Sequence, residues 1–191
     1  MRIVTFDIET ANWLQDTGSS NPADLDIALV GIHDSETNEY TSYLEPELGK
    51  LWKILERTDI LVGYNSDHFD IPLLNKYYPG ELSHIKSVDI MKEVYASLGR
   101  RLKLDSIAEA TLDTKKSGSG AQSLVWWRSG EIEKVREYCI KDVDITRKIF
   151  EYALKNGSIK YKELGKNREV KLDTSAWLAP ASRSLTFTLG L

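Results

Sequence analysis

Three separate groups of residues have the types and spacing needed to hold metal ions. In the first group, Asp7 and Glu9 lie two residues apart in a segment that alternates apolar and polar residues. Residues two apart in a strand share a face, so both carboxylates can reach one cation. Hard oxygen ligands of this kind suit Mg²⁺ or Mn²⁺. The first group therefore predicts a divalent-metal site at the end of a strand.

The second and third groups belong to other elements that can add ligands to the same site. Residues 65–70 (Asn-Ser-Asp-His-Phe-Asp) stand at a strand-to-helix junction, and Tyr138 and Asp142 lie four residues apart in a helical stretch. Residues four apart stack on one face of a helix, so Tyr138 and Asp142 can enter one cavity. The spacing allows a joint site built from all three groups.

Each group alone also has a purely structural explanation. Acids at a strand end are common at protein surfaces. The acids of residues 65–70 can cap a helix or occupy its first turn. Tyr138 and Asp142 can form a solvent-facing pair on a helix. The functional interpretation is favoured because all three groups occur in one chain, in order, each on an element that can direct it inward.

The elements that position these groups follow from hydrophobic periodicity and turn residues. The predicted order β-β-β-α-β-α-β-α-α favours a five-stranded mixed sheet flanked by helices, an α/β fold, over a doubly wound sheet. Residues 12–26 and 115–120 are predicted loops. Strands are predicted at 2–8, 27–33, 39–44, 60–62 and 87–89, and helices at 47–55, 69–78, 90–98 and 104–112.

A long helical stretch follows and ends before Asn156-Gly157. An apolar stripe runs along it, and Cys139 on this stripe is expected to be a buried small hydrophobe. The stripe consists of Ile132, Val135, Cys139, Val143, Phe150 and Leu154. After it, residues 158–161 and 169–172 predict a small hairpin around Gly165-Lys166-Asn167, whereas residues 175–191 allow no assignment.

Composition limits the class of protein. With 191 residues, 41% of them hydrophobic, the chain is expected to form one domain that needs no disulfide. It contains one cysteine, so a reducing compartment is expected and a structural zinc site is disfavoured. The longest uncharged apolar run, residues 27–32, is too short for a membrane span, and residues 1–7 do not resemble a signal peptide. We therefore expect a cytoplasmic protein without a membrane segment.

The net charge of −4 argues against a protein that wraps nucleic acid by charge alone. It does not argue against an enzyme that acts on nucleic acid. A site made of several carboxylates contributes negative charge of its own, and bound divalent cations would offset that charge.

Taken together, the three groups resemble the motifs of the DEDD superfamily of 3′-to-5′ exonucleases, which have a ribonuclease H-like fold. The sister branch carries a histidine one residue further from the last aspartate, where this chain has Glu137, so the match is to the tyrosine branch (DEDDy). The chain is similar to small predicted exonucleases related to the proofreading domains of family-B DNA polymerases. The motifs are Phe6-Asp7-Ile8-Glu9-Thr10, Asn65-x-x-x-Phe69-Asp70 and Tyr138-x-x-x-Asp142.

The resemblance covers residues 1–157, which leaves 158–191 as a C-terminal extension of the same domain. It implies two divalent cations, Mg or Mn, bound by Asp7, Glu9, Asp70 and Asp142, with Asp7 bridging both. Two such ions supply +4 against four carboxylates. Tyr138 would orient the attacking water, since a phenol with a pKa of about 10 is a poor general base.

The resemblance also implies substrate contacts at Thr10, Asn65 and Phe69. Phe69 in the core and Asn65 at a turn are equally compatible with the sequence. Lys115 and Lys116 can reach phosphates or be an ordinary solvated pair, and Trp126-Trp127 can stack on bases or pack in the core. His68 is expected at the surface or near the substrate, and Asp89 and Asp144 are left out of the metal set.

The predicted function is a metal-dependent 3′-to-5′ exonuclease that releases nucleoside 5′-monophosphates from single-stranded DNA or RNA ends. A partner polymerase, helicase or repair factor is conceivable, but the sequence identifies none. One alternative is a nucleic-acid-binding or assembly subunit that does not cleave, although such a subunit has no use for clustered carboxylates. Another is a magnesium phosphatase, which needs an aspartate where this chain has Glu9.

Overall fold

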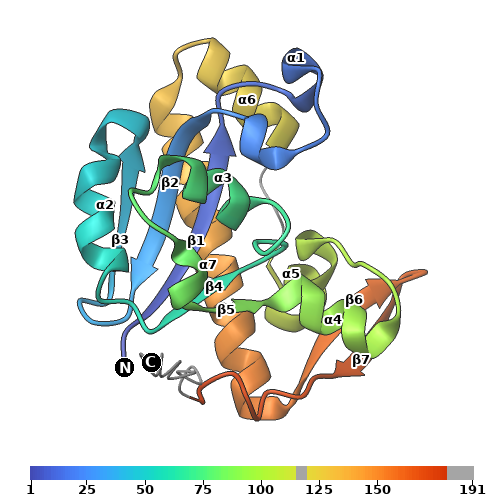
Figure 1. Ribbon diagram of the computed structural model, residues 1–191. Coiled ribbons are helices and arrows are strands. Elements are labelled where there is room, and N and C mark those ends of the chain that lie inside the picture. The colour runs from blue at the N-terminus through green and yellow to red at the C-terminus, as the bar shows by residue number, and fades with distance from the viewer. Residues whose placement is uncertain (115–119, 180–191) are drawn as a thin grey trace, which may run out of the picture.

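The centre of the molecule is a five-stranded mixed sheet with the strand order β3-β2-β1-β4-β5 (Figure 1). The computed structural model describes residues 1–114 and 120–179. β2 pairs antiparallel with β1 and β3, whereas β4 pairs parallel with β1 and β5. The expected α/β fold with a mixed sheet is therefore confirmed. The strands are β1 (Ile3–Thr10), β2 (Ile27–Asp34), β3 (Glu39–Leu44), β4 (Ile60–Gly63) and β5 (Lys86–Asp89).

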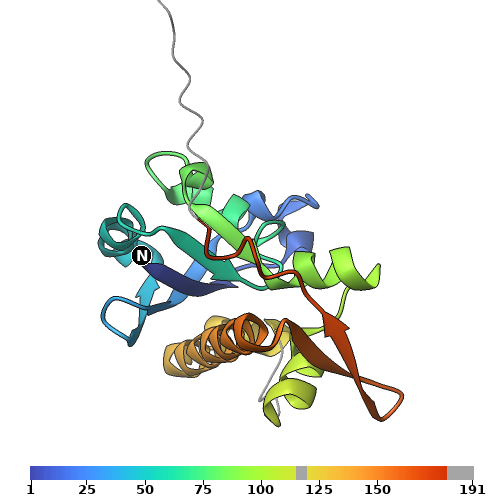
Figure 2. The same ribbon diagram turned by 90° about the horizontal axis from the view of Figure 1, so that it is seen from below.

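Helices cover both faces of this sheet. The longest helix, α7, crosses one face, and α2 and α3 cover the other (Figure 2). No helix within 1–114 and 120–179 is long and apolar enough to span a membrane. The helices are α1 (Leu14–Thr17), α2 (Leu48–Leu55), α3 (Asp70–Tyr77), α4 (Ile90–Leu98), α5 (Leu104–Leu112), α6 (Gly120–Arg128) and α7 (Ile132–Asn156), with 3₁₀ turns at Pro22–Asp24, Glu45–Glu47 and Leu82–His84.

The central strands are largely apolar because both faces of the sheet are covered, and the exception is the face of β1 that carries Asp7 and Glu9. All eight residues of β2 are buried. In β1, Phe6 and Ile8 pack in the core with α2 and α3, whereas Ile3 packs on the other core, which includes residues of α7. A strand between two layers of helices needs apolar residues at nearly every position.

β1 reaches past its parallel neighbour. The predicted strand ended at Ile8, but β1 continues to Thr10, paired with β2 along this length. Its pairing with β4 stops at Thr5, opposite Val62. The edge of β1 beyond Thr5 therefore has no strand partner on the β4 side. Asp7 lies in this open stretch.

The helical stretch predicted after residue 120 is two helices, α6 and α7. Gly130 has a φ of +74°, which ends α6 and turns the chain before α7 begins. The predicted stripe on α7 faces the core, and Val135, Cys139 and Val143 are fully buried. The turn at Gly130 thus places α6 against α7, and the two do not form one continuous helix.

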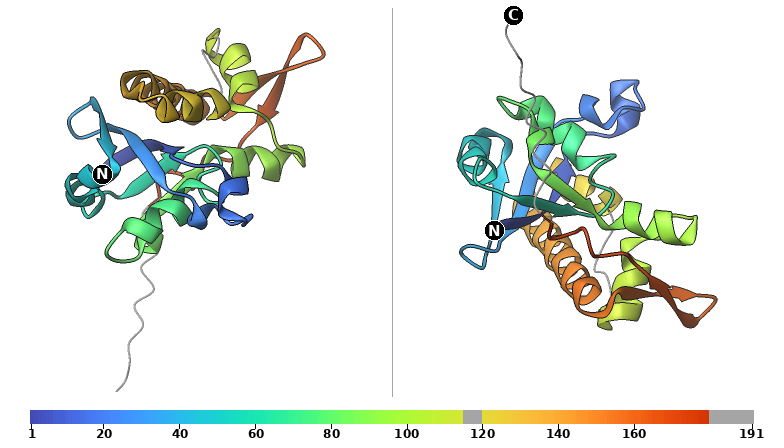
Figure 3. Two further views of the ribbon diagram at one scale, coloured as in Figure 1. Left: turned by 90° about the horizontal axis from the view of Figure 1, so that it is seen from above. Right: turned by 60° about the horizontal axis from the view of Figure 1, so that its bottom comes forward.

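The predicted terminal hairpin is present, with longer strands than expected: β6 (Ser158–Glu163) and β7 (Lys166–Lys171). It projects beside the main sheet, next to α4 and α5 (Figure 3). The strands turn at Leu164-Gly165, both with positive φ, as a two-residue hairpin turn requires. Tyr161 and Val170 pack into the core beside α7. The division of domains at residue 157 stays a prediction.

Two hydroxyl side chains of α5 bind the outer edge of β6. The Thr111 hydroxyl donates to the carbonyl oxygen of Lys160 at 2.7 Å and accepts from its N–H at 3.0 Å. The Ser106 hydroxyl makes the same two bonds with Lys162, both at 3.0 Å. These bonds satisfy backbone groups that a strand at the edge of a sheet otherwise exposes.

Candidate active site

A single cavity of about 460 Å³ lies at the end of β1 and contains every residue that the three motifs predicted for the site. Its other lining residues come mainly from the segment after β1 and from the start of α6. Residues up to 135 positions apart in the sequence therefore meet here. The predicted site residues that line it are Asp7, Glu9, Thr10, Asn65, Phe69, Asp70, Tyr138 and Asp142.

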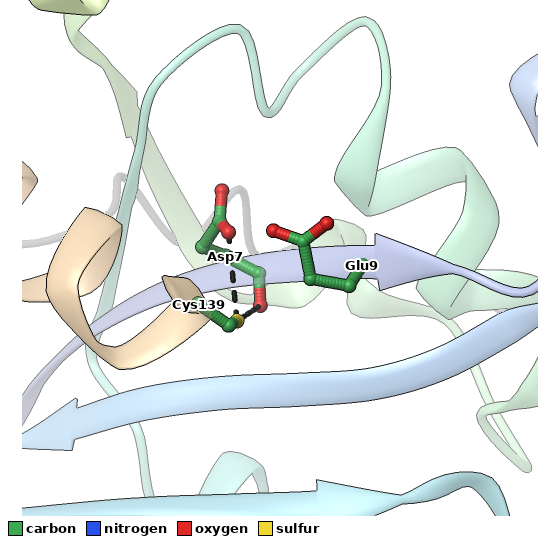
Figure 4. A group of neighbouring side chains, drawn as sticks. All are labelled: Asp7, Glu9 and Cys139. Atoms are coloured by element: carbon green, nitrogen blue, oxygen red, sulfur yellow. Dashed lines mark hydrogen bonds between the residues drawn. The ribbon is translucent and has the colours of Figure 1, made fainter. Parts of the chain in front are cut away.

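Asp7 and Glu9 point to the same side of β1, as the two-residue spacing predicts (Figure 4). Glu9 is buried, and Asp7 is half-buried. One oxygen of each carboxylate and the Cys139 sulfur lie within 4.8 Å of one another. Two carboxylates this close can share one cation.

Asp70 fills the gap left where β4 ends. It is the first residue of α3, and its Oδ1 accepts a hydrogen bond of 3.2 Å from the backbone N–H of Ile8. That N–H lies on the part of β1 that has no partner strand on this side. The Asp70 carboxylate thus accepts a hydrogen bond that a carbonyl of a partner strand would otherwise accept. This bond fixes Asp70 next to the two acids of β1.

α7 brings Tyr138 and Asp142 to the cavity, and both side chains are buried. The helix can approach β1 and β2 closely because Gly31, which pairs with Asp7, has no side chain. A Cβ atom at Gly31 would lie 2.7 Å from the Cys139 sulfur. The Cys139 thiol in turn donates to the Asp7 backbone oxygen at 3.4 Å and to its Oδ2 at 3.5 Å (Figure 4).

Burial and like charge shift the pKa values of the acids upward. The pKa of Asp7 is raised well above its usual range by burial and then by the charges of Glu9, Asp142 and Asp70. Burial raises the pKa of Asp70 to about 7, although the Ile8 N–H opposes this. In the protein without cations, ionising these acids together is therefore unfavourable.

Tyr138 and Cys139 stay neutral in this environment. Burial raises the pKa of the Tyr138 phenol, and the charges of Asp142 and Glu9 raise it further. Burial and the Asp7 charge do the same to the pKa of the Cys139 thiol. A protonated thiol is a poor ligand for a hard cation, so Cys139 acts here as a donor to Asp7.

The donor set fits hard divalent cations. Four carboxylates line the cavity, and none of the lining residues within 1–114 and 120–179 is Lys, Arg or His. Bound Mg²⁺ or Mn²⁺ would offset the like charges that raise the pKa of Asp7, and would favour the ionised form of the buried Asp70. A buried acidic cluster is thus present, and its chemistry matches the cation class expected from the sequence.

Comparison with known proteins agrees with this geometry. The family model described as RNase_H superfamily matches residues 4–155. The chain belongs to the RNase H superfamily. A search of curated proteins found no match. Among solved structures, the family B DNA polymerase from the hyperthermophilic archaeon Pyrobaculum calidifontis is similar, with a TM-score of 0.63 and 20% identity. The similarity covers 81% of this chain and 24% of the polymerase chain.

Membership in the RNase H superfamily supports a nuclease-type function with a nucleic-acid substrate. The polymerase comparison, at 20% identity, adds agreement in fold alone.

The loop that carries Asn65 is held by an acid outside the cavity. Asn65 has a φ of +65°, a left-handed conformation that asparagine tolerates better than most residues. Its N–H donates to Asp89 Oδ1 at 2.8 Å, and the N–H of Asp67 donates to Asp89 Oδ2 at 3.1 Å. Asp89 also caps α4. Its exclusion from the predicted metal set therefore agrees with its structural role in this RNase H-like domain.

The side chains of the predicted substrate contacts are placed as follows. The Asn65 Oδ1 is buried and has no hydrogen-bond partner among the described residues. Phe69 is half-buried, packs on the core beside α3, and also lines the cavity, so both of its predicted roles are compatible with its position. The Thr10 hydroxyl donates to the Asn12 carbonyl at 3.1 Å. All three face the space beside the acids.

One wall of the cavity was not predicted. This wall is formed by residues 12–15, which belong to the predicted loop 12–26. α1 is short here, and its start is fixed by an Asp16 carboxylate that accepts from the Trp13 N–H at 2.9 Å. The three-residue spacing of Trp13 and Asp16 is the signal that reveals this turn. Tyr64 also lines the cavity, and its hydroxyl donates to the Leu102 carbonyl at 2.7 Å.

The remaining candidates lie away from the acids. His68 is exposed and does not line the cavity, which agrees with its predicted surface position. Asp144 lies on the outer side of α7, where it binds Tyr40 and Lys148. Trp126 and Trp127 are both half-buried against the core beside α7. Lys115 and Lys116 lie outside the described residues.

Proposed function

We propose that this RNase H superfamily protein is a metal-dependent 3′-to-5′ exonuclease that releases nucleoside 5′-monophosphates from single-stranded DNA or RNA. The observation that carries the proposal is the convergence of four carboxylates and Tyr138 in one cavity. The tyrosine at this position supports the tyrosine branch of the DEDD exonucleases. The neighbouring Asn65 and Phe69 provide a place for a terminal nucleotide.

In this proposal Asp7, Glu9, Asp70 and Asp142 would hold two divalent cations. When bound, the cations would activate a water molecule and stabilise the leaving oxygen of the phosphodiester. The protein fixes the positions of these ligands beforehand. Asp70 is fixed by the Ile8 N–H, and Asp7 by its backbone pairing and the Cys139 thiol.

Tyr138 orients the attacking water in this scheme. Its raised pKa keeps the phenol protonated at neutral pH, so it can donate a hydrogen bond but does not serve as a base. Tyr138 and Asp142 lie four residues apart on α7 and line the same cavity. A neutral phenol held beside a carboxylate can direct a water toward phosphorus without adding charge.

The proposed reaction breaks the bond between phosphorus and the 3′ oxygen of the penultimate nucleotide. Water supplies the new oxygen on phosphorus and loses a proton, and the leaving 3′ oxygen gains one. The products are a nucleoside 5′-monophosphate and a strand shortened by one nucleotide with a free 3′-hydroxyl. Phe69 and Asn65 line the cavity beside the acids, and the ring of Phe69 supports packing on the terminal base.

The test is hydrolysis of 3′-labelled and 5′-labelled single-stranded oligonucleotides in Mg²⁺ or Mn²⁺, with EDTA as the metal-free control. We expect labelled mononucleotide from the 3′ end at once and a descending ladder from the 5′-labelled strand. Asp7→Asn should reduce the rate by about 10³-fold or more, because a ligand of the reacting cations is lost.

A matched control is Asp144→Asn, an acid on the same helix that lies outside the cavity and binds Lys148. This variant should keep the wild-type rate. Absence of mononucleotide from both DNA and RNA with either metal would contradict the proposal. Equal activity of Asp7→Asn and Asp144→Asn would contradict the metal assignment.

A further inference from the structure

A second hollow, of about 380 Å³, lies on the α6 side of Tyr138. Tyr138 lines both this hollow and the candidate active site, so the two spaces are separated by one aromatic side chain. Nothing in the exonuclease proposal uses the second hollow. Its lining residues are Trp126, Lys134, Glu137, Tyr138 and Lys141.

Two lysines on one stripe of α7 outnumber the single acid, Glu137, in the lining of the hollow. Lys134 and Lys141 are seven residues apart, which is about 10 Å along the helix. Lys134 is paired with Glu131, one turn before it. Lys141 is half-buried and has no ion-pair or hydrogen-bond partner within residues 1–114 and 120–179. A cation that is held beside a hollow and lacks an internal partner is available to an anionic ligand.

The third contribution is aromatic. Trp126 is half-buried, and its ring contacts Tyr138 edge-on, with centroids 6.2 Å apart and an interplanar angle of 64°. Its remaining surface faces the hollow. Proteins that bind single-stranded nucleic acid combine aromatic surfaces for bases with basic groups for phosphates. Trp126 and Lys141 supply both kinds of group on the same side of Tyr138.

Electrostatics gives a reason for basic residues beside the acidic cavity. The four acids of the cavity repel a phosphate backbone, and the described lining of the cavity contains no basic residue to oppose this. Lysines placed just outside the acids can hold the strand without competing for the cations. Lys141 lines the second hollow together with Tyr138, and Tyr138 also lines the cavity of the acids.

We propose that this hollow is a subsite for the nucleotides immediately 5′ of the terminal one, with Lys141 and Lys134 on phosphates and Trp126 on a base. The inference rests on the proposed exonuclease function and extends it to a substrate of several nucleotides. It therefore gives this protein a preference for oligonucleotides over dinucleotides.

The first test measures binding apart from hydrolysis. Fluorescence anisotropy of a labelled octathymidylate or octauridylate is recorded against salt concentration, in EDTA and in Ca²⁺. Each phosphate contact contributes about 0.7 to the slope of log K against log salt for a single strand. We expect Lys141→Ala and Lys134→Ala each to lower the slope by about this amount, and the double variant to lower it by about 1.4.

Matched variants separate subsite contacts from general effects. Lys155→Ala removes an exposed lysine of the same helix, about 21 Å from Lys141, and should leave the slope unchanged. Trp126→Leu should weaken binding at least about fivefold with no change in slope, because stacking carries no charge. Trp126→Phe preserves an aromatic ring and should recover most of the affinity, which distinguishes stacking from a folding defect.

The second test is kinetic. The ratio of kcat/KM for an octanucleotide to that for a dinucleotide should fall about tenfold in the double lysine variant. Unchanged salt slopes and an unchanged ratio would overturn the subsite, as would a wild-type protein that binds neither oligonucleotide in either buffer. A wild-type protein that binds with lysine-dependent slopes but hydrolyses nothing would refute the exonuclease and leave the binding subsite standing.

Discussion

The two ends of β1 carry buried acids in opposite surroundings. At its start, the buried Asp34 of β2 accepts from the Arg2 guanidinium at 3.0 Å, and Arg2 also pairs with Glu36 at 2.9 Å. At its other end, Asp7 and Glu9 face more carboxylates and no basic side chain among the described lining residues. One end is balanced by a basic side chain of the protein, whereas the described lining at the other end supplies no basic side chain.

The direction of the pKa shifts expresses this difference. Burial alone would raise the pKa of Asp34, but the hydrogen bonds from Arg2 and from the backbone N–H of Glu36 lower it overall. Burial also acts on Asp7, and there the neighbouring charges add to the rise. An opposite charge next to a buried acid favours its ionised form, whereas like charges next to a buried acid make ionisation unfavourable.

The largest effect is expected from Asp70→Asn at the unbalanced end. Activity should fall about 10³-fold, while stability in EDTA at pH 8 should rise by roughly 2–4 kcal/mol, because a carboxylate with a pKa of about 7 is no longer forced to ionise. Kinetics and thermal unfolding check the two parts. A variant that loses both activity and stability would show that Asp70 is mainly structural.

Arg2→Met removes the guanidinium group that pairs with Asp34 and Glu36 at the start of β1. We expect a loss of about 3 kcal/mol in the free energy of unfolding, because Asp34 is left buried without its cation. The specific activity of the folded protein should be unchanged, since the pair lies at the far end of β1. Urea unfolding of the single variant and of Arg2→Met with Asp34→Asn measures the effect, and the double variant should recover part of the loss. Equal losses in both would argue against an uncompensated charge.

Tyr138→Phe removes a hydroxyl group from the acidic cavity at the end of β1 without altering the charge of the cavity. We expect kcat to fall by about 10- to 100-fold because the water loses its orienting donor. Cation affinity, measured by calorimetry, should stay within about twofold, since no carboxylate is removed. A rate equal to wild type would exclude the proposed role of the phenol.

The smallest effect is the pH dependence of stability. The folded-state pKa of Asp70 lies above its unfolded value, so stability is full below the unfolded value and is lost as pH rises toward about 7. In EDTA we expect a loss of about 1 kcal/mol between pH 6 and 8 from this group. Mg²⁺ should abolish the loss, and so should Asp70→Asn. A flat profile in EDTA would contradict the raised pKa.

Periodicity and motif spacing were sufficient to predict the sheet, most of the helices and the acids that line the cavity. Residues two apart in a strand and four apart in a helix share a face whatever the rest of the chain does, so Asp7 with Glu9 and Tyr138 with Asp142 could be paired in advance. The terminal hairpin also followed from local turn residues. These features depend on short-range geometry.

Contacts between distant segments could not be predicted in this way. The hydrogen bond from Ile8 to Asp70 exists because β1 extends beyond the end of its pairing with β4. How far two neighbouring strands pair depends on tertiary structure and cannot be read from either segment alone. The position of Cys139 under Asp7 depends on the missing side chain of Gly31. The turn at Gly130 cannot be predicted from hydrophobic spacing, because the apolar residues before and after it fit one continuous helix.

The hydroxyl groups of Ser106 and Thr111 have a consequence for assembly. Since they occupy the free backbone positions of β6, a strand from another molecule cannot add to that side of the hairpin by hydrogen bonding. On the opposite strand, the Ser97 hydroxyl occupies the Lys171 carbonyl at 2.6 Å. The β6 edge of the two-stranded sheet is thereby protected against the addition of a further strand, although the hairpin projects beside the main sheet.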